Sequence, residues 1–214
     1  MLELSLFAGG ASAFAETAPA LASPLTAEDR ATPQQQRDVS TPGVTLSERP
    51  FAALWQVKAW PGGMAAVETA IAASVGATAP GPGFSAGDPA GALALRTAPL
   101  AWWIVGEGPV ARPDLGGAGT LLDLSHARWR LRLEGTARDA VLSRLISLDL
   151  RPGRFGPGRV ALAPIQHLGC VFHVGEDGGA GPAPVDIYAP RSQARALWKL
   201  VRDTAIPFGC QIGP

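Results

Sequence analysis

The clearest pattern of apolar and polar positions lies in residues 119–150. From Asp123 to Glu134 the two kinds of residue alternate, which predicts a half-buried strand. Its apolar face carries Ala127, Trp129, Leu131 and Leu133, and its polar face carries Arg128, Arg130, Arg132 and Glu134.

A helix is predicted directly after this strand. Gly135 ends the strand, and Thr136 is placed to cap a helix, with Asp139 three residues further on. One face of the helix collects Ala137, Val141, Leu145 and Leu148. Such a unit cannot bury its apolar faces alone, so we expect further strands beside it and a sheet beneath the helix.

The chain before this unit predicts a strand, a helix and two more strands. The strands are residues 51–60, 93–97 and 100–105. The helix has Val67, Ile71 and Val75 on one face and Gly76 as its C-terminal cap.

The chain after it predicts more strand and a final helix. Residues 159–174 are predicted to be strand interrupted at Pro164, and 185–189 to be a short strand. The helix starts with Ser192 as N-cap, ends before Pro207, and has Ala194, Leu197, Trp198, Val201 and Ala205 on one face. We therefore predict an α+β fold of two βαββ-like half-units, with antiparallel sheets covered by helices.

Residues 1–42 differ in composition from the rest of the chain. They are rich in Ala, Ser, Thr, Pro and Gln without sustained periodicity, which predicts an extended arm that does not fold by itself. Its apolar residues include Leu2, Leu4, Leu6, Phe7 and Phe14. Because a solvated tail has no need of them, we hypothesise that the arm lies along another protein. Residues 43–214 are predicted to form the folded domain.

Charge and composition limit the class of protein. The formal net charge is zero, which argues against a nucleic-acid binder. There is no apolar run of about 18 residues, so we expect no membrane span. The N-terminus carries Glu3 and has no Lys or Arg before Arg30, unlike a secretory signal, and only Cys170 and Cys210 are present. We expect a cytoplasmic location.

Residues 106–111 follow a predicted apolar strand and match G-x-G-x-x-A, the motif of a dinucleotide-binding site. The fingerprint needs a helix to begin inside the motif, so that its N–H groups face the pyrophosphate. Pro109, Pro113, Gly116 and Gly117 oppose such a helix. We interpret the segment as a turn.

A metal site and a nucleophile are also weakly indicated. In an extended chain Cys170 faces away from His167 and His173, which disfavours zinc. Ser125 and His126 point to opposite strand faces, and Asp123 and Ser125 are suited to satisfying backbone groups where the strand begins. Glu176 and Asp177 are interpreted as part of a solvated turn. We expect no catalytic, cofactor-binding or metal-binding residue in this chain.

Interface candidates come from aromatic and arginine residues. Trp102 and Trp103 are adjacent in a predicted strand, so they face opposite sides, and one of them is a candidate for an interface. Lys58 and Lys199 are the only lysines, so the positive charge is carried mainly by arginine, which pairs well with carboxylates. The interface candidates are therefore Trp102, Trp103, Arg128, Arg130 and Arg132. The three arginines form either a solvated surface or a patch that binds an acidic partner.

Several motifs stand out by their order and spacing: the run Gly119–Gly135, D-L-S-H at Asp123–His126, F-G-P-G at Phe155–Gly158, and D-I-Y-A-P-R-S at Asp186–Ser192 followed by Leu197 and Trp198. Together they resemble the gamma subunit of heterotetrameric sarcosine oxidase. The resemblance covers roughly residues 51–208. D-L-S-H, and T-A-P-L-A-W-W-I-V-G at Thr97–Gly106, are also similar to the folate-binding aminomethyltransferase family.

The resemblance implies a noncatalytic small subunit whose fold is similar to part of the aminomethyltransferase architecture. Its partners would be alpha, beta and delta subunits, which would hold FAD, FMN, NAD, zinc and tetrahydrofolate. The complex would demethylate sarcosine oxidatively and pass the one-carbon unit to tetrahydrofolate. N-methylglutamate dehydrogenase complexes have a similar small subunit, so the substrate stays open.

Two alternatives remain. One is a stand-alone, single-lobe folate-dependent aminomethyl-transfer enzyme, against which residues 160–174 lack the Asp pair of the aminomethyltransferases. The other is a generic ferredoxin-like binding module.

Overall fold

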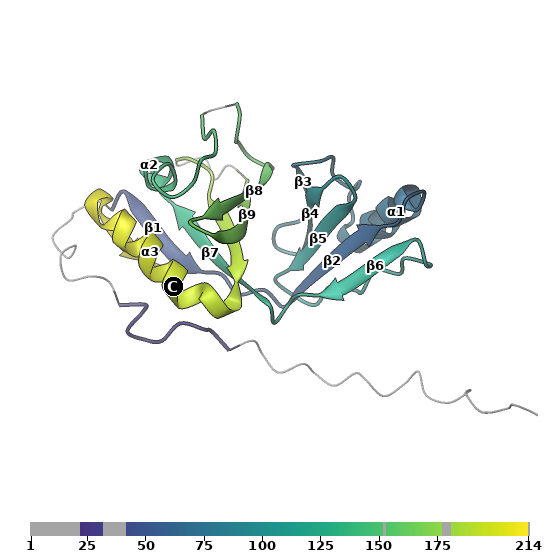
Figure 1. Cartoon of the computed structure of the whole chain (residues 1–214), viewed down its shortest axis with the longest axis horizontal. Coiled ribbons are helices and arrows are strands. Elements are labelled where there is room, and N and C mark those ends of the chain that lie inside the picture. The colour runs from purple at the N-terminus through teal and green to yellow at the C-terminus, as the bar shows by residue number, and fades with distance from the viewer. Residues whose placement is uncertain (1–21, 32–41, 152, 177–180, 214) are drawn as a thin grey trace, which may run out of the picture.

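The computed structural model describes residues 22–31, 42–151, 153–176 and 181–213. They form two β-sheets that pack against each other, with helices on the outer side of each sheet (Figure 1). The predicted α+β fold with helix-covered, mainly antiparallel sheets is confirmed.

The six-stranded sheet contains, in order, β11 (Cys210–Ile212), β1 (Val44–Glu48), β7 (Arg128–Glu134), β10 (Val185–Pro190), β9 (Leu168–Val174) and β8 (Val160–Ile165). Neighbours are antiparallel except β1 and β11, which are parallel. Figure 1 shows α2 (Arg138–Leu142) and α3 (Ala194–Ala205) on its outer side. Short 3-10 helices flank α3, at Arg191–Gln193 and Ile206–Phe208.

The five-stranded sheet contains, in order, β3 (Ser85–Gly87), β4 (Ala92–Ala98), β5 (Ala101–Gly106), β2 (Ala53–Ala59) and β6 (Gly119–Asp123). Helix α1 (Met64–Val75) covers its outer side. The helix buries Val67, Ile71 and Val75, as predicted. Gly76 ends it in the left-handed conformation, at φ 67°, which a residue with a Cβ rarely adopts.

Apolar side chains form three cores. The largest lies between the six-stranded sheet and its helices, and the second between the five-stranded sheet and α1. The third joins the two sheets, where Trp103 of β5 meets Tyr188 of β10 edge-on, with ring centroids 6.0 Å apart. Since each sheet is covered on both faces, strands such as β5 and β10 are almost wholly buried.

The prediction of one strand from Asp123 to Glu134 is wrong. The chain forms two strands, β6 and β7, which belong to different sheets. Between them the N–H groups of Ala127 and Arg128 both donate to the carbonyl of Leu124, which closes a turn. The alternating pattern continued through this turn and so did not reveal it. The predicted faces of β7 are correct, because Trp129, Leu131 and Leu133 enter one core.

The helix starts at two places also differ from the prediction. Thr136 does not cap α2, which has Ala137 at its N-cap and ends at Leu142, well before Leu148. Ser192 lies in a 3-10 turn, and α3 begins after Gln193. The predicted buried face of α3 is correct in every position.

The break in residues 159–174 falls two positions later than predicted. Pro164 lies within β8, opposite Gly169, and the turn is at Gln166, whose φ is 54°. Proline is tolerated there because β8 is an edge strand. Strands β1, β3 and β11 were not predicted as strands; β1 and β11 bring the two ends of the folded domain together in one sheet.

Candidate functional site

The described part of the predicted arm folds onto its own chain. We call residues 22–31 the N-terminal clasp. Leu25 enters the largest core, with 5% of its surface exposed. Thr26 and Asp29 close a turn, in which the Thr26 N–H and hydroxyl both donate to the Asp29 carboxylate at 2.8 Å. The other predicted arm residues, including Leu2 and Phe14, lie outside the described residues, so the hypothesis that the arm lies along a partner stays a prediction.

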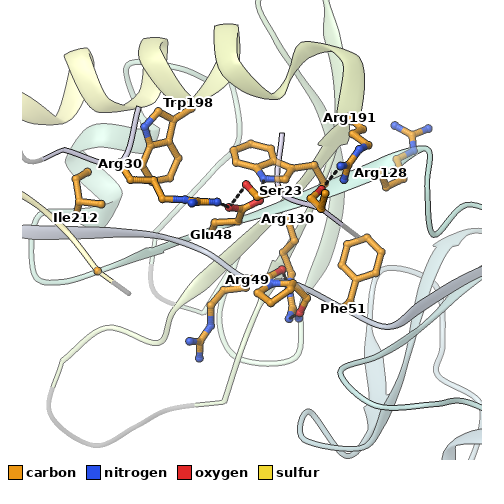
Figure 2. Close-up of a pocket in the computed structure, with 14 residues that line it drawn as sticks. Ser23, Arg30, Glu48, Arg49, Phe51, Arg128, Arg130, Arg191, Trp198 and Ile212 are labelled. Carbon is orange, nitrogen blue, oxygen red and sulfur yellow. Dashed lines mark hydrogen bonds and ion pairs between the residues drawn. The ribbon is translucent and has the colours of Figure 1, made fainter. Parts of the chain in front are cut away.

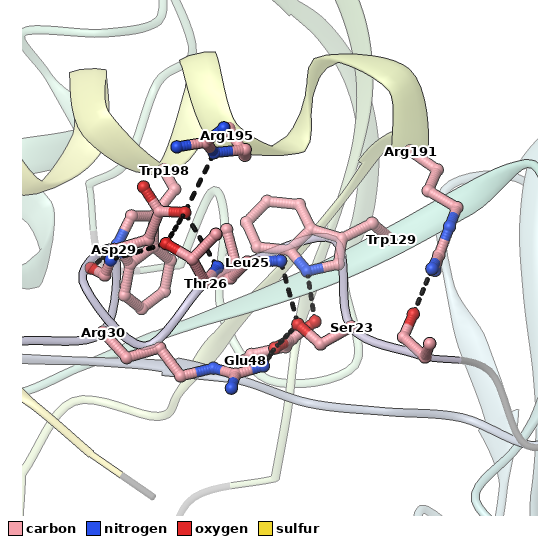
Figure 3. Close-up of polar contacts among 11 residues, drawn as sticks. Ser23, Leu25, Thr26, Asp29, Arg30, Glu48, Trp129, Arg191, Arg195 and Trp198 are labelled. Atoms are coloured by element: carbon pink, nitrogen blue, oxygen red, sulfur yellow. Dashed lines mark hydrogen bonds and ion pairs between the residues drawn. The ribbon is translucent and has the colours of Figure 1, made fainter.

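Helix α3 holds one side of the clasp (Figure 3). The Trp198 indole N–H donates to the Asp29 carbonyl at 2.6 Å, and Arg195 Nε donates to the Asp29 carboxylate at 2.9 Å. Hydrogen bonds from the Thr26 N–H and hydroxyl, and after them the interaction with Arg195, lower the pKa of the Asp29 carboxyl to about 2. Arg191, just before the helix, donates to the Ala22 carbonyl.

Glu48, at the end of β1, holds the other side. One of its carboxylate oxygens accepts from the Trp129 indole N–H at 2.8 Å. The other accepts from the Ser23 hydroxyl at 2.5 Å and from Arg30 at 2.8 Å (Figure 3). One carboxylate therefore connects the clasp to strand β7.

A pocket of about 430 Å³ lies beneath the clasp (Figure 2). Among the described residues, its lining includes one carboxylate, that of Glu48, and five arginines: Arg30, Arg49, Arg128, Arg130 and Arg191. Its apolar wall includes Phe51, Trp129 and Trp198. The rings of the two tryptophans meet edge-on, with their centroids 6.2 Å apart. The pocket thus combines positive charge with aromatic surface.

A buried charge cluster lies between the sheets. Arg132 of β7 binds Asp186 of β10 through two hydrogen bonds of 2.7 and 2.8 Å. Arg130 lies 3.8 Å from the same carboxylate and donates to Glu107 at 2.8 Å. The hydrogen bonds that Arg132 donates to Asp186 raise the pKa of Arg132. Burial raises the pKa of the Tyr188 phenol beside this cluster.

His173 borders the same cluster. Its Nε2 lies 3.0 Å from the Ser85 hydroxyl, and its Nδ1 lies 4.0 Å from Asp186. Burial lowers the pKa of His173 to about 4, because the imidazolium loses its hydration. The ring is therefore neutral at physiological pH and acts as a buried structural residue.

The predicted structural roles of Asp123 and Ser125 are confirmed. The Ser125 hydroxyl accepts a hydrogen bond from the buried N–H of Leu54 at 2.9 Å, and the Asp123 carboxylate accepts one from Ser125 N–H at 2.8 Å. His126 is exposed at the turn. The hydrogen bond between Ser125 and Leu54 therefore joins the turn after β6 to β2, and His126 has no part in it.

The dinucleotide-like segment forms a loop, and the histidine–cysteine segment is extended, as the sequence predicts. Residues 107–118 connect β5 to β6 without a helix, as the turn interpretation predicts. Cys170 packs in the largest core while His173 lies on the opposite face of β9, and burial raises the pKa of the Cys170 thiol. Within the described ranges no three His, Cys, Asp or Glu side chains lie close enough to share a metal ion. Asp177 lies outside them.

The interface candidates are mostly internal. Trp102 faces α1 and Trp103 faces the other sheet, so they do point to opposite sides, but both are buried. Both are buried because β5 is covered on both faces, and Trp103 lies at the interface between the two sheets of this chain. Arg130 and Arg132 belong to the buried cluster, and Arg128 is half-buried. No partner is present to test these residues as interface residues.

Sequence reasoning missed Glu48, Arg191 and the clasp. The T-x-x-D pattern at Thr26–Asp29, which resembles a capping box, was a local signal that part of the arm is structured. No local signal marks Glu48 as the acceptor for Trp129, since 81 residues separate them.

Comparisons with known proteins agree with this architecture. No family model matches the chain. It is 34% identical, over 131 residues, to the sarcosine oxidase subunit gamma of Corynebacterium sp. (strain U-96). The alignment covers 58% of this chain and 63% of that subunit, so the chain spans less than two thirds of the length of this curated relative.

A solved structure shares the fold. It is the heterotetrameric sarcosine oxidase from Corynebacterium sp. U-96 in complex with pyrrole 2-carboxylate, one chain of which matches with a TM-score of 0.65 and 27% identity. The match covers 80% of this chain and 88% of that chain. The resemblance to the sarcosine oxidase gamma subunit noted in the sequence is therefore confirmed by both sequence and fold.

Proposed function

We propose that the chain is the noncatalytic gamma subunit of a heterotetrameric sarcosine oxidase-like complex. The observation that carries this proposal is the joint likeness in sequence and fold: 34% identity to a curated gamma subunit, and a TM-score of 0.65 over most of the chain to a heterotetrameric sarcosine oxidase. The complex would oxidise sarcosine or a related N-methyl amino acid and transfer the one-carbon unit to tetrahydrofolate.

Side-chain chemistry supports a structural role. The residues of a catalytic type are engaged in holding the fold: Ser125 accepts from a backbone N–H, and Asp186 is paired with Arg132. His173 is buried and neutral at physiological pH. The proposed task of the subunit is to stabilise the assembly.

The partners in this proposal are alpha, beta and delta subunits, and the location is the cytoplasm. FAD, FMN, NAD, zinc and tetrahydrofolate would be held by those subunits. The described part of the chain contains no helix long and apolar enough to span a membrane.

Purification of the tagged chain from its native host tests the proposal. We expect subunits with flavin absorbance to co-elute, and the eluate to oxidise sarcosine or another N-methyl amino acid. Calorimetry of the chain alone with tetrahydrofolate distinguishes the alternative enzyme: tight binding, or turnover by the chain alone, contradicts the noncatalytic role.

A further inference from the structure

The pocket beneath the clasp holds positive charge that no carboxylate neutralises. Arg30 is paired with Glu48, and Arg130 with Glu107 and Asp186. Among the residues that the structure describes, no carboxylate lies within ion-pair distance of Arg49, Arg128 or Arg191. This local excess is unusual in a chain whose formal net charge is zero.

Two of these arginines are neighbours at one end of the pocket (Figure 2). Arg128 lies opposite Pro190 across β7 and β10, and the backbone N–H of Arg191 donates to the carbonyl of Ala127. Both side chains are half-buried. The two chain segments are thus held side by side, and both arginines line the pocket.

The environment of Arg128 favours an anionic partner. Its guanidinium lies 5.1 Å from the centroid of the Trp103 ring. Burial lowers the pKa of Arg128, because its charge is desolvated without a compensating carboxylate. Arg191 donates to a neutral carbonyl, that of Ala22, although a guanidinium has five N–H donors suited to two-pronged binding of an oxyanion.

The rest of the pocket suits an apolar body. Phe51 and the Trp129–Trp198 pair form aromatic wall, and a volume of about 430 Å³ is within the range of small-molecule sites. Glu48 is occupied by three donors, so it does not oppose an anion as a free carboxylate does.

We propose that this pocket binds a small organic anion, with its carboxylate or phosphate held by Arg128 and Arg191 and its apolar part against the aromatic wall. The clasp forms part of the pocket wall through Ala22, Ser23 and Arg30, so the bound anion competes with the Ala22 carbonyl for Arg191. This inference stands independently of the proposed function.

Calorimetry on the full-length protein tests it with three probes of similar shape: benzoate, phenyl phosphate and benzamide. We expect at least one of the two anions to bind and neutral benzamide not to bind. Whichever of benzoate and phenyl phosphate binds more tightly shows whether the pocket prefers a carboxylate or a phosphate. Arg128→Gln and Arg191→Gln should each weaken that anion by about tenfold or more, since each removes charge-assisted hydrogen bonds.

Arg112→Gln is the matched control, because Arg112 is exposed and does not line this pocket. Its affinity for the anion should equal that of the wild type. The probe series on the wild-type protein decides the matter even if a variant fails to fold. Equal binding of benzamide, binding that all three variants retain, or no binding of either anion at millimolar concentration overturns the proposal.

Discussion

Arg132 and Asp186 face each other directly across strands β7 and β10, and two hydrogen bonds of 2.7 and 2.8 Å join them. Asp186 is buried and also lies 3.8 Å from Arg130 and 4.0 Å from His173. One carboxylate thus compensates two arginines between the sheets. Two charges on the polar face of β7, those of Arg130 and Arg132, are consequently part of the interior of the fold.

Removing this carboxylate should destabilise the protein strongly. Asp186→Asn removes the carboxylate that Arg132 binds through two hydrogen bonds and that lies 3.8 Å from Arg130, and we expect a loss of about 3 kcal/mol in the free energy of unfolding. Urea unfolding followed by tryptophan fluorescence measures it. Asp203→Asn, at an exposed and loosely paired position, should change the stability by less than about 0.5 kcal/mol. Equal effects of the two substitutions would contradict the role given to Asp186.

Stability should fall as the pH is lowered from 6.5 towards 4. The pKa of His173 is about 4 in the folded protein, against an ordinary value of 6.5, so the unfolded chain binds the proton more tightly in this interval. The contribution of the neutral ring is complete above about pH 6.5 and decreases below it, by roughly 3 kcal/mol in total. Urea unfolding at several pH values measures this slope.

His173→Gln should reduce that pH dependence. A slope between pH 6.5 and 4 that is identical in this variant and in the wild type would exclude His173 as its source.

Glu48→Ala should release the clasp. The substitution removes the acceptor of Ser23, Arg30 and the Trp129 indole at once. Because opening of the segment controls its cleavage, trypsin should cut after Arg30 about tenfold faster than in the wild type. Glu28→Ala removes a neighbouring carboxylate that is exposed in the clasp, and should leave the rate unchanged. If Glu48→Ala left the cleavage rate unchanged, Glu48 would not be the residue that holds the clasp on the fold.

The substitution Ser125→Ala tests whether Ser125 has a structural role or acts as a nucleophile. The Leu54 N–H loses its buried acceptor, so we expect a loss of about 1–3 kcal/mol in stability. The turnover of the assembled complex should stay unchanged. A fall in turnover by orders of magnitude, with the complex intact, would instead assign Ser125 a catalytic role.

The sequence was sufficient for the elements whose apolar periodicity matches one buried face. Helix α1, with Val67, Ile71 and Val75, and helix α3, with Leu197 and Trp198, were predicted with their correct inner faces. Period alone cannot show where one strand becomes two, because a short turn between Asp123 and Arg128 preserves the alternation. The division of β6 and β7 between two sheets therefore needed the structure.

The pocket and the clasp could not be predicted, for a different reason. Their contacts join residues far apart in sequence, such as Trp198 with Asp29 and Trp129 with Glu48. The charged face of β7 looked solvent-exposed or partner-facing, since nothing local shows that Asp186 lies opposite Arg132. Pairing across strands depends on topology, which local composition does not specify.

The central claim is that this chain contributes structure to an enzyme complex and holds no reactive centre of its own. Its most direct test is the N-methyl amino acid oxidation rate of the chain alone, compared with that of the complex purified through it. We predict turnover and flavin absorbance in the complex and none in the isolated chain. Oxidation of sarcosine by the isolated chain, or a stoichiometric flavin bound to it, would contradict the claim.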